Sequence, residues 1–410
     1  MFLAAYKTNM MKKLLILPSF LLLFMVVSAQ ETNAPAFGKG LFNLVGKDST
    51  WTMKIGTRMQ ILSISEWEEG ASDGWVNPEQ NFLVRRARLK FDGFAYSPKL
   101  KYKIELGLSN RDISGASAFT RNTPRYILDA VVMWNFYENF ELWFGQTKLP
   151  GNIERVISSG NLQQVDRSLV NSRFNIDRDV GFQLRHHFNL SDKFLIREKI
   201  AFSQGEGRNI TQGNEGGHQY TGRLEFLPFG KFTSKGDYSG SDLKREETPK
   251  LMFAVNYDIN KDAVKTRSNL GSYMFNDVGL YETTINTFFF DGMFKYNGFS
   301  LMWEYAERDA DDPIATNSDG SPTGDIVQVG KGLNLQSGYL FPSNWELSGR
   351  YTNIKLDEAI TGSLPETQYT LGVSKYIVGH KLKVQSDISL LDVDGGSNEL
   401  MFRMQLDVHF

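Results

Sequence analysis

The chain has 410 residues, with 45 Lys and Arg against 47 Asp and Glu, and no cysteine, which excludes disulfides, thiolate metal sites and a cysteine nucleophile. Its formal net charge of -2 becomes -5 when the first 29 residues, with three lysines and no acidic residue, are set aside. A chain with this balance is not expected to bind nucleic acid, because nucleic-acid-binding domains carry a basic surface.

The N-terminal region is typical of a secretory signal peptide. Lys12 and Lys13 precede an apolar run from Leu14 to Val27, and a small residue stands at the expected cleavage site. The run is too short to be a membrane anchor. We predict a signal peptide over 1–29, whose first ten residues fit an upstream start-site extension, followed by a short periplasmic segment over 30–50.

Beyond this segment the chain alternates apolar and polar residues with a period of two, as strands do. Met53, Ile55 and Met59, for example, alternate with Lys54 and Arg58. No helical stripe of any length competes with this pattern. We therefore predict an all-β protein with sixteen strands, near 52–65, 81–96, 99–109, 125–137, 140–147, 179–189, 193–204, 218–228, 250–258, 282–296, 299–308, 328–340, 345–355, 366–377, 380–392 and 399–410.

The predicted connections alternate in length. Short turns fall at 97–98, 138–139, 190–192, 297–298, 341–344 and 378–379. Longer, polar, glycine-rich loops fall between them, at 66–78, 110–124, 148–178, 205–217, 259–281, 309–327, 356–365 and 393–398. The segment 229–249 breaks the alternation, and either an insertion or an error in the predicted register would explain it.

An even number of strands, with short turns at one rim and long loops at the other, is the layout of an outer-membrane barrel. A barrel is also the only spanning structure open to a mature sequence without an apolar run of about eighteen residues. A soluble sandwich is the alternative, but a sandwich seldom contains sixteen strands. We predict a transmembrane antiparallel β-barrel over 51–410.

The last predicted strand, 399–410, alternates apolar and polar residues and ends in Phe410. A terminal strand that closes on phenylalanine resembles the signal that is read by the barrel-assembly machinery of Gram-negative outer membranes. We therefore expect this machinery and the lipid of the outer membrane to be partners of the chain.

The stretch FLVRRARLKF, at 82–91, places four cationic residues in a predicted strand. Its apolar members are predicted to face lipid: Leu83, Ala87, Leu89 and Phe91. Arg86, Arg88 and Lys90 then face the lumen together, about 7 Å apart along the strand. Arg85 is out of phase, and it could snorkel, pair with a neighbour or mark a bulge.

Neighbouring strands extend this cluster. Lys54 and Arg58 precede it, and Lys101 and Lys103 follow it, which predicts a cationic wall across three strands. Rows of Arg and Lys select anions in a pore, and the planar fork of Arg suits phosphate oxygens. The alternative is that these charges only solvate a water-filled lumen.

RRARLKFDG at 85–93, FGQTKLPG at 144–151 and the closing strand resemble the phosphate-selective porin O and P family. The resemblance is spread over most of the mature chain. It implies a barrel of sixteen strands, a homotrimer, and an inward-folded third loop, 148–178, whose cations conduct phosphate or its polymers. Two features depart from this pattern: the mature chain is acidic, and carboxylates follow the loop cations closely enough to pair with them.

The predicted ion pathway combines the strand cations with those that the resemblance assigns to the third loop: Arg58, Arg86, Arg88, Lys90, Lys101, Lys103, Lys148, Arg155, Arg167 and Arg173. We expect an outer-membrane porin of a Gram-negative bacterium that is not an enzyme and uses no cofactor or metal. It is predicted to form a water-filled, anion-preferring channel for passive uptake of phosphate-like anions. One alternative is a general or oligosaccharide-type porin without strong ion selectivity, and another is an enzyme or adhesin that uses the barrel as an anchor.

Overall fold

A computed structural model describes residues 35–70, 74–113, 115–212 and 217–410 of the chain. The chain divides into two compact units, 1–36 and 37–410, and every element below belongs to the second unit. The predicted signal peptide lies outside the described residues. Within the predicted segment 30–50, the short strand β1 (Phe42–Val45) pairs with the start of the first long strand.

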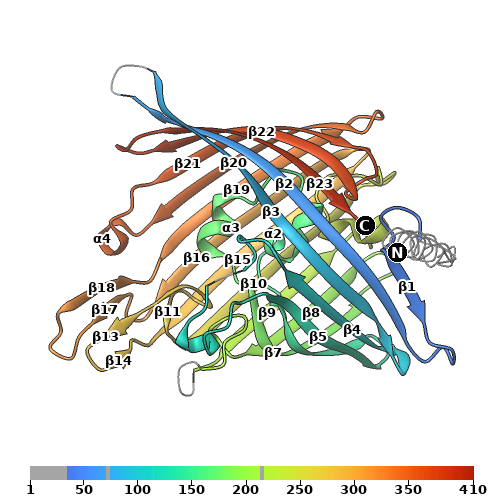
Figure 1. The fold of residues 1–410 in the computed structure, drawn as a ribbon, viewed down its shortest axis with the longest axis horizontal. Helices are drawn as coiled ribbons and strands as arrows, with labels where there is room; N and C mark the ends of the chain where they lie inside the picture. Colours follow the sequence, from blue (N-terminus) through green and yellow to red (C-terminus); the bar gives the residue numbers. More distant parts are fainter. Residues whose placement is uncertain (1–34, 71–73, 114, 213–216) are drawn as a thin grey trace, which may run out of the picture. The chain divides into compact units, whose positions relative to one another are not determined.

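The second unit is a closed antiparallel β-barrel (Figure 1). Sixteen long strands form its wall within the described residues: β2 (Thr52–Glu69), β3 (Trp75–Ala95), β4 (Ser97–Gly107), β5 (Ile127–Tyr137), β6 (Phe140–Lys148), β7 (Arg178–Asn189), β8 (Leu195–Ser203), β9 (Gln219–Leu227), β10 (Lys250–Ala263), β15 (Thr283–Tyr296), β16 (Phe299–Ala310), β19 (Gly330–Leu340), β20 (Trp345–Leu356), β21 (Glu366–Tyr376), β22 (Leu382–Val393) and β23 (Glu399–His409). β2 pairs with β23 and closes the sheet, so the backbone groups of the strands bond within the wall, as a lipid bilayer requires. The predicted fold is confirmed, and each predicted strand corresponds to one of these sixteen.

Side chains alternate between the two faces of the barrel wall. In β2, Met59 and Ile61 are 47% and 46% exposed, whereas Gln60 and Leu62 between them are 0% and 2% exposed. The exposed face is the one that meets lipid, and the buried face is the one that meets the interior. This arrangement explains why the period-two pattern of the sequence predicted the strands well.

Arg85 lies at a β-bulge in β3. Gln60 of β2 is opposite Arg86 while the next residue of β2, Ile61, is opposite Val84, so the pairing skips Arg85. The bulge shifts the earlier part of the strand by one position, which puts Val84 on the outer face and Leu83 on the inner face. The prediction that Leu83 faces lipid is therefore wrong.

Short turns and long connections lie at opposite rims. The long connections contain only short helices and strands: η2 (Ala118–Thr120), β11 (Lys265–Arg267), β12 (Leu270–Tyr273), β13 (Phe275–Asn276), β14 (Gly279–Leu280), β17 (Ile314–Thr316), β18 (Pro322–Ile326) and α4 (Glu358–Thr361). Among the described residues no helix is long and apolar enough to cross a membrane.

Two further connections carry helical turns. The connection 149–177, called the third loop below, contains α2 (Ile153–Val156), η3 (Ser159–Asn161) and α3 (Leu169–Phe174). At the short-turn rim, residues 228–249 contain η4 (Thr233–Tyr238). We call this segment the short-turn insertion. It is an insertion and not an error of register, because the strands on either side of it pair directly with each other.

Candidate functional site

The third loop is bonded to the inner faces of strands that are far from it in sequence. The backbone N–H of Ile153 donates to Asp291 of β15 at 3.0 Å, and that of Glu154 donates to Glu304 of β16 at 3.1 Å. Arg308 of β16 donates to the carbonyls at the end of α3. These contacts place α2 and α3 against β15 and β16, behind β2 and β3 in Figure 1.

Apolar side chains hold the third loop in the same position. One buried cluster joins α2 and η3 to β8, β9, β10, β15, β16 and the short-turn insertion: Ile153, Ile157, Leu162, Leu195, Leu227, Phe232, Met252, Ala254, Met293 and Met302. A second cluster joins both ends of the loop to the wall: Leu149, Val170, Phe174, Ile176, Ala201, Phe289, Ala306 and Ile354. Because burial of apolar surface stabilises packing by roughly 25 cal/mol per Å², these clusters fix the loop to the wall.

Three cavities follow one another beside the loop. The long-loop cavity, of about 360 Å³, is lined by residues of the long connections, including Arg125, Arg208 and Lys265. The middle cavity, of about 320 Å³, lies between β3 and the third loop. The short-turn cavity, of about 580 Å³, extends along β4 to β8 to the short-turn insertion. Arg178 lines all three, so the cavities adjoin one another around this residue.

All three cavities have a cationic lining. Nine Lys or Arg side chains and three carboxylates line the middle cavity. The short-turn cavity is lined by nine Lys or Arg side chains and four carboxylates, and the long-loop cavity by five Lys or Arg side chains and one carboxylate. The positive lining is therefore local, because the chain as a whole has 47 Asp and Glu against 45 Lys and Arg. A cleft with walls of one sign raises the concentration of ions of the opposite sign.

Arginines of β3 connect the wall to the third loop. Arg85 and Arg86 lie 2.6 Å and 3.5 Å from the carboxylate of Asp166 in the loop. Burial alone would raise the pKa of Asp166, but these two guanidinium groups hold its pKa well below the ordinary value. Arg88 pairs instead with Asp112, at 2.7 Å, in the long connection between β4 and β5. Part of the cationic charge predicted from the sequence is thus paired.

Four cations of the middle cavity have no carboxylate partner among the described residues: Arg111, Lys148, Arg167 and Arg208. Lys148 donates to the carbonyls of Arg155 and Ile157, at 2.6 Å and 3.1 Å. Arg167 donates to the carbonyls of Glu154 and Ile157, both at 2.9 Å. Carbonyl oxygens orient these side chains without cancelling their charge. Arg167 and Lys148 therefore belong, with Arg111 and Arg208, to the cations of this cavity that no described carboxylate pairs with.

The long-loop cavity contains a lysine that is buried against the loops. Lys265 is 2% exposed, and its ammonium group lies 4.5 Å from the centre of the Tyr273 ring. Burial, and after it the charge of Arg125, lowers the pKa of Lys265 to about 8. Its charge therefore depends on pH in a range that can be reached by experiment.

The structure brings together six of the predicted pathway residues around the middle and short-turn cavities: Arg86, Arg88, Lys103, Lys148, Arg155 and Arg167. The other four line none of the three cavities. Arg58 is buried, pairs with Asp407 at 2.7 Å and donates to Ser159 of the third loop. Arg173 pairs with Glu366 at 2.8 Å.

Lys90 and Lys101 are the remaining two predicted residues, and neither is buried. Lys90 lies 2.9 Å from Asp92 in the same strand. Both therefore lie outside the three cavities, although each keeps the inward phase of its strand.

Sequence reasoning missed several cations that line the cavities: Arg111, Arg178, Arg185, Arg197, Lys199, Arg208, Lys231 and Lys235. The alternation of β7 already gave Arg185 the inward phase. Pairing then puts Arg185 directly opposite Lys199 of β8. The same alternation could have found both, but their proximity depends on the register between the strands, which the sequence alone does not provide.

The comparisons with known proteins agree with this fold. Residues 69–405 match the family described as phosphate-selective porin O and P. An uncharacterized protein of Aquifex aeolicus is 24% identical over 338 residues, which cover 76% of each chain.

Two solved structures have a similar fold. The outer membrane channel DcaP of Acinetobacter baumannii is 13% identical, with a TM-score of 0.51, and the match covers 90% of this chain and 100% of that one. An anion-selective porin from Comamonas acidovorans is 10% identical, with a TM-score of 0.51 over 87% of this chain and 100% of that one. At these identities the two structures support the fold alone. The family match covers most of the chain and indicates a channel rather than an enzyme: the chain belongs to the phosphate-selective porin O and P family and is a porin of the Gram-negative outer membrane.

Proposed function

We propose that the porin prefers anions and admits phosphate-like anions by passive diffusion. The observation that carries this proposal is the excess of Lys and Arg over carboxylates in all three cavities. An anion that enters the lumen loses part of its hydration shell, and N–H donors of these side chains replace it. No covalent chemistry and no cofactor are needed for this process.

We propose that the third loop narrows the lumen at the middle cavity. Its Arg167 and the adjoining Lys148 keep their charges unpaired, whereas Asp166 neutralises part of the charge of Arg85 and Arg86. A mixed lining of this kind suits conduction, because an ion must be attracted strongly enough to enter but weakly enough to leave.

The predicted residues then divide into two roles. Arg86, Arg88, Lys103, Lys148, Arg155 and Arg167 contact the permeating anion or set the local field. Arg58 and Arg173 hold the third loop in place. Arg58 of the wall donates to Ser159 of the loop, and Arg173 of the loop pairs with Glu366 of the wall. Lys90 and Lys101 contribute only to the wider field of the lumen.

Uptake by proteoliposomes tests the proposal. We expect radiolabelled phosphate to enter several times faster than rubidium ions or glycerol at equal concentration. Equal rates for the three solutes would overturn the anion preference while leaving the porin assignment intact. The absence of any uptake would instead favour a barrel that anchors an enzyme or adhesin.

A general or oligosaccharide-type porin is the second candidate. The ion pairs Arg88–Asp112 and Arg155–Asp177 favour it, because each removes a cation from the effective field of the middle cavity. Rapid swelling of liposomes in neutral disaccharides would support it. The homotrimer and the role of Phe410 in assembly stay predictions, which cross-linking and deletion of Phe410 would test.

A further inference from the structure

The short-turn insertion is a fixed part of the barrel. Lys295 of β15 is 2% exposed and donates to the carbonyls of Gly236 and Ser239, each at 2.8 Å. Asp242 accepts from the backbone N–H of Gly298 at 2.8 Å, in the adjacent short turn. Buried hydrogen bonds to charged groups are among the stronger ones in proteins, so the insertion keeps a defined position.

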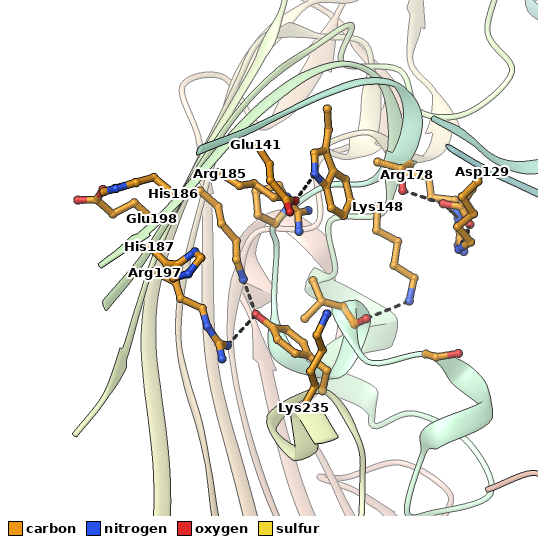
Figure 2. A pocket seen from close by; sticks show the side chains of 18 of the residues that line it. Asp129, Glu141, Lys148, Arg178, Arg185, His186, His187, Arg197, Glu198 and Lys235 are labelled. Atoms are coloured by element: carbon orange, nitrogen blue, oxygen red, sulfur yellow. Dashed lines mark hydrogen bonds and ion pairs between the residues drawn. The ribbon is translucent and has the colours of Figure 1, made fainter. Parts of the chain in front are cut away.

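The insertion builds one wall of the short-turn cavity. It contributes Lys231, Phe232, Lys235 and Tyr238, and Arg185 of β7 belongs to the wall opposite. Figure 2 shows Arg185 and Lys235 on either side of the same open space. Without this insertion the cavity would lose two cations and two aromatic rings.

The linings of the short-turn and middle cavities differ in kind. Among side chains, the middle cavity includes one large apolar residue, Leu128. The short-turn cavity includes the aromatic rings of Trp143, Phe232 and Tyr238 together with Val156. Ligand cavities of roughly 300–1,000 Å³ with aromatic walls and a few placed polar groups are typical of sites for organic molecules.

The rings are held in fixed orientations. The indole N–H of Trp143 donates to Glu141 at 2.9 Å, and the guanidinium carbon of Arg185 lies 3.6 Å from the centre of the indole ring. The hydroxyl of Tyr238 donates to Glu225 at 2.7 Å. Fixed aromatic surfaces lose little entropy when a ligand binds against them.

Several cations beside these rings are not neutralised. In the described part of the chain, Arg185, Lys231 and Lys235 form no ion pair, and Arg185 bonds to the side-chain oxygen of Gln183. Of the other cations that line the cavity, Lys148 also has no carboxylate partner among the residues described, and the rest are paired, as Arg197 is with Asp237. Arg185, which stacks on Trp143, therefore places an unpaired charge at the aromatic surface.

We infer that the short-turn cavity is a binding site for organic anions. A carboxylate or phosphate group of the ligand binds to Arg185, Lys231 and Lys235, and its apolar body packs against Trp143 and Tyr238. Inorganic phosphate would use the cations but leave the aromatic surface in water. This inference rests on the proposed anion preference and narrows it to anions that carry an apolar body.

Block of the chloride current through single channels tests the inference, with phenyl phosphate and inorganic phosphate added on the short-turn side. We expect phenyl phosphate to block at concentrations about tenfold lower than phosphate, as one aromatic contact would give. Trp143→Ala should remove most of that difference and leave block by inorganic phosphate unchanged. Lys235→Ala, at an exposed residue, should weaken block by phenyl phosphate severalfold without affecting folding.

Lys244→Ala is the matched control, because Lys244 is an exposed lysine of the same insertion that does not line the cavity. It should leave the block unchanged. Equal block by the two phosphates in a channel that still prefers anions would overturn the organic-anion site but not the proposed function. Loss of anion preference in the wild-type channel would overturn the proposed function itself. If Trp143→Ala fails to fold, an unchanged block in Lys235→Ala would still contradict the inference.

Discussion

Arg167→Gln removes one unpaired charge from the middle cavity and keeps a side-chain donor for the carbonyls of Glu154 and Ile157. A permeating anion roughly 5 Å from the guanidinium gains about 0.8 kcal/mol in a medium as polar as water. A cation at the same place loses the same amount. This free energy corresponds to an about fourfold change in the occupancy of each ion, in opposite directions. We therefore expect the anion-to-cation permeability ratio to fall by roughly fifteenfold.

Reversal potentials across a planar bilayer with a salt gradient measure this ratio directly. The effect should be largest at low ionic strength, because salt screens charges in a water-filled lumen. Lys244→Gln, which removes an exposed lysine that lines none of the three cavities, is the matched control and should leave the potential unchanged. The same reversal potential in Arg167→Gln, Lys244→Gln and the wild type would contradict this role of Arg167.

Three further predictions follow from single contacts. Asp166→Asn removes the carboxylate between Arg85 and Arg86, so reversal potentials should shift towards stronger anion preference, and a weaker preference would contradict the proposed arrangement. Because the pKa of Lys265 is lowered to about 8, its charge is present below that pH and lost above it; anion preference should fall between pH 7 and 9 in the wild type but not in Lys265→Met. Lys295→Met removes the donor to the carbonyls of the short-turn insertion, which should destabilise the insertion by about 1–3 kcal/mol and expose the Lys244–Arg245 region to trypsin. Equal resistance of Lys295→Met and the wild type to trypsin would show that other contacts hold the insertion.

The sequence predicted the barrel well because lipid and water impose opposite demands on the two faces of each strand. Met59 and Ile61 on one face and Gln60 on the other satisfy both demands, and nothing in their neighbourhood competes. The pattern failed at Leu83, because Leu83 and Val84 are both apolar and either could have faced lipid. Only the pairing with β2 decides between them.

The pathway was less accessible to sequence reasoning than the barrel. Arg58 was assigned to the lumen by its phase, but its buried pair with Asp407 joins residues 349 positions apart and depends on closure of the barrel. Arg185 and Lys199 became neighbours only through the register of β7 and β8. Phase along a strand can be read from the sequence, whereas partners across strands and loops cannot.

The reversal potential of the wild-type channel in a KCl gradient measures whether the lumen prefers anions. We expect a reversal potential that lies on the side of the chloride equilibrium potential and becomes larger as ionic strength falls and screening weakens. A potential near zero, or one with the sign of potassium, would contradict it, because the Lys and Arg side chains of the cavities would then have no net effect on permeation.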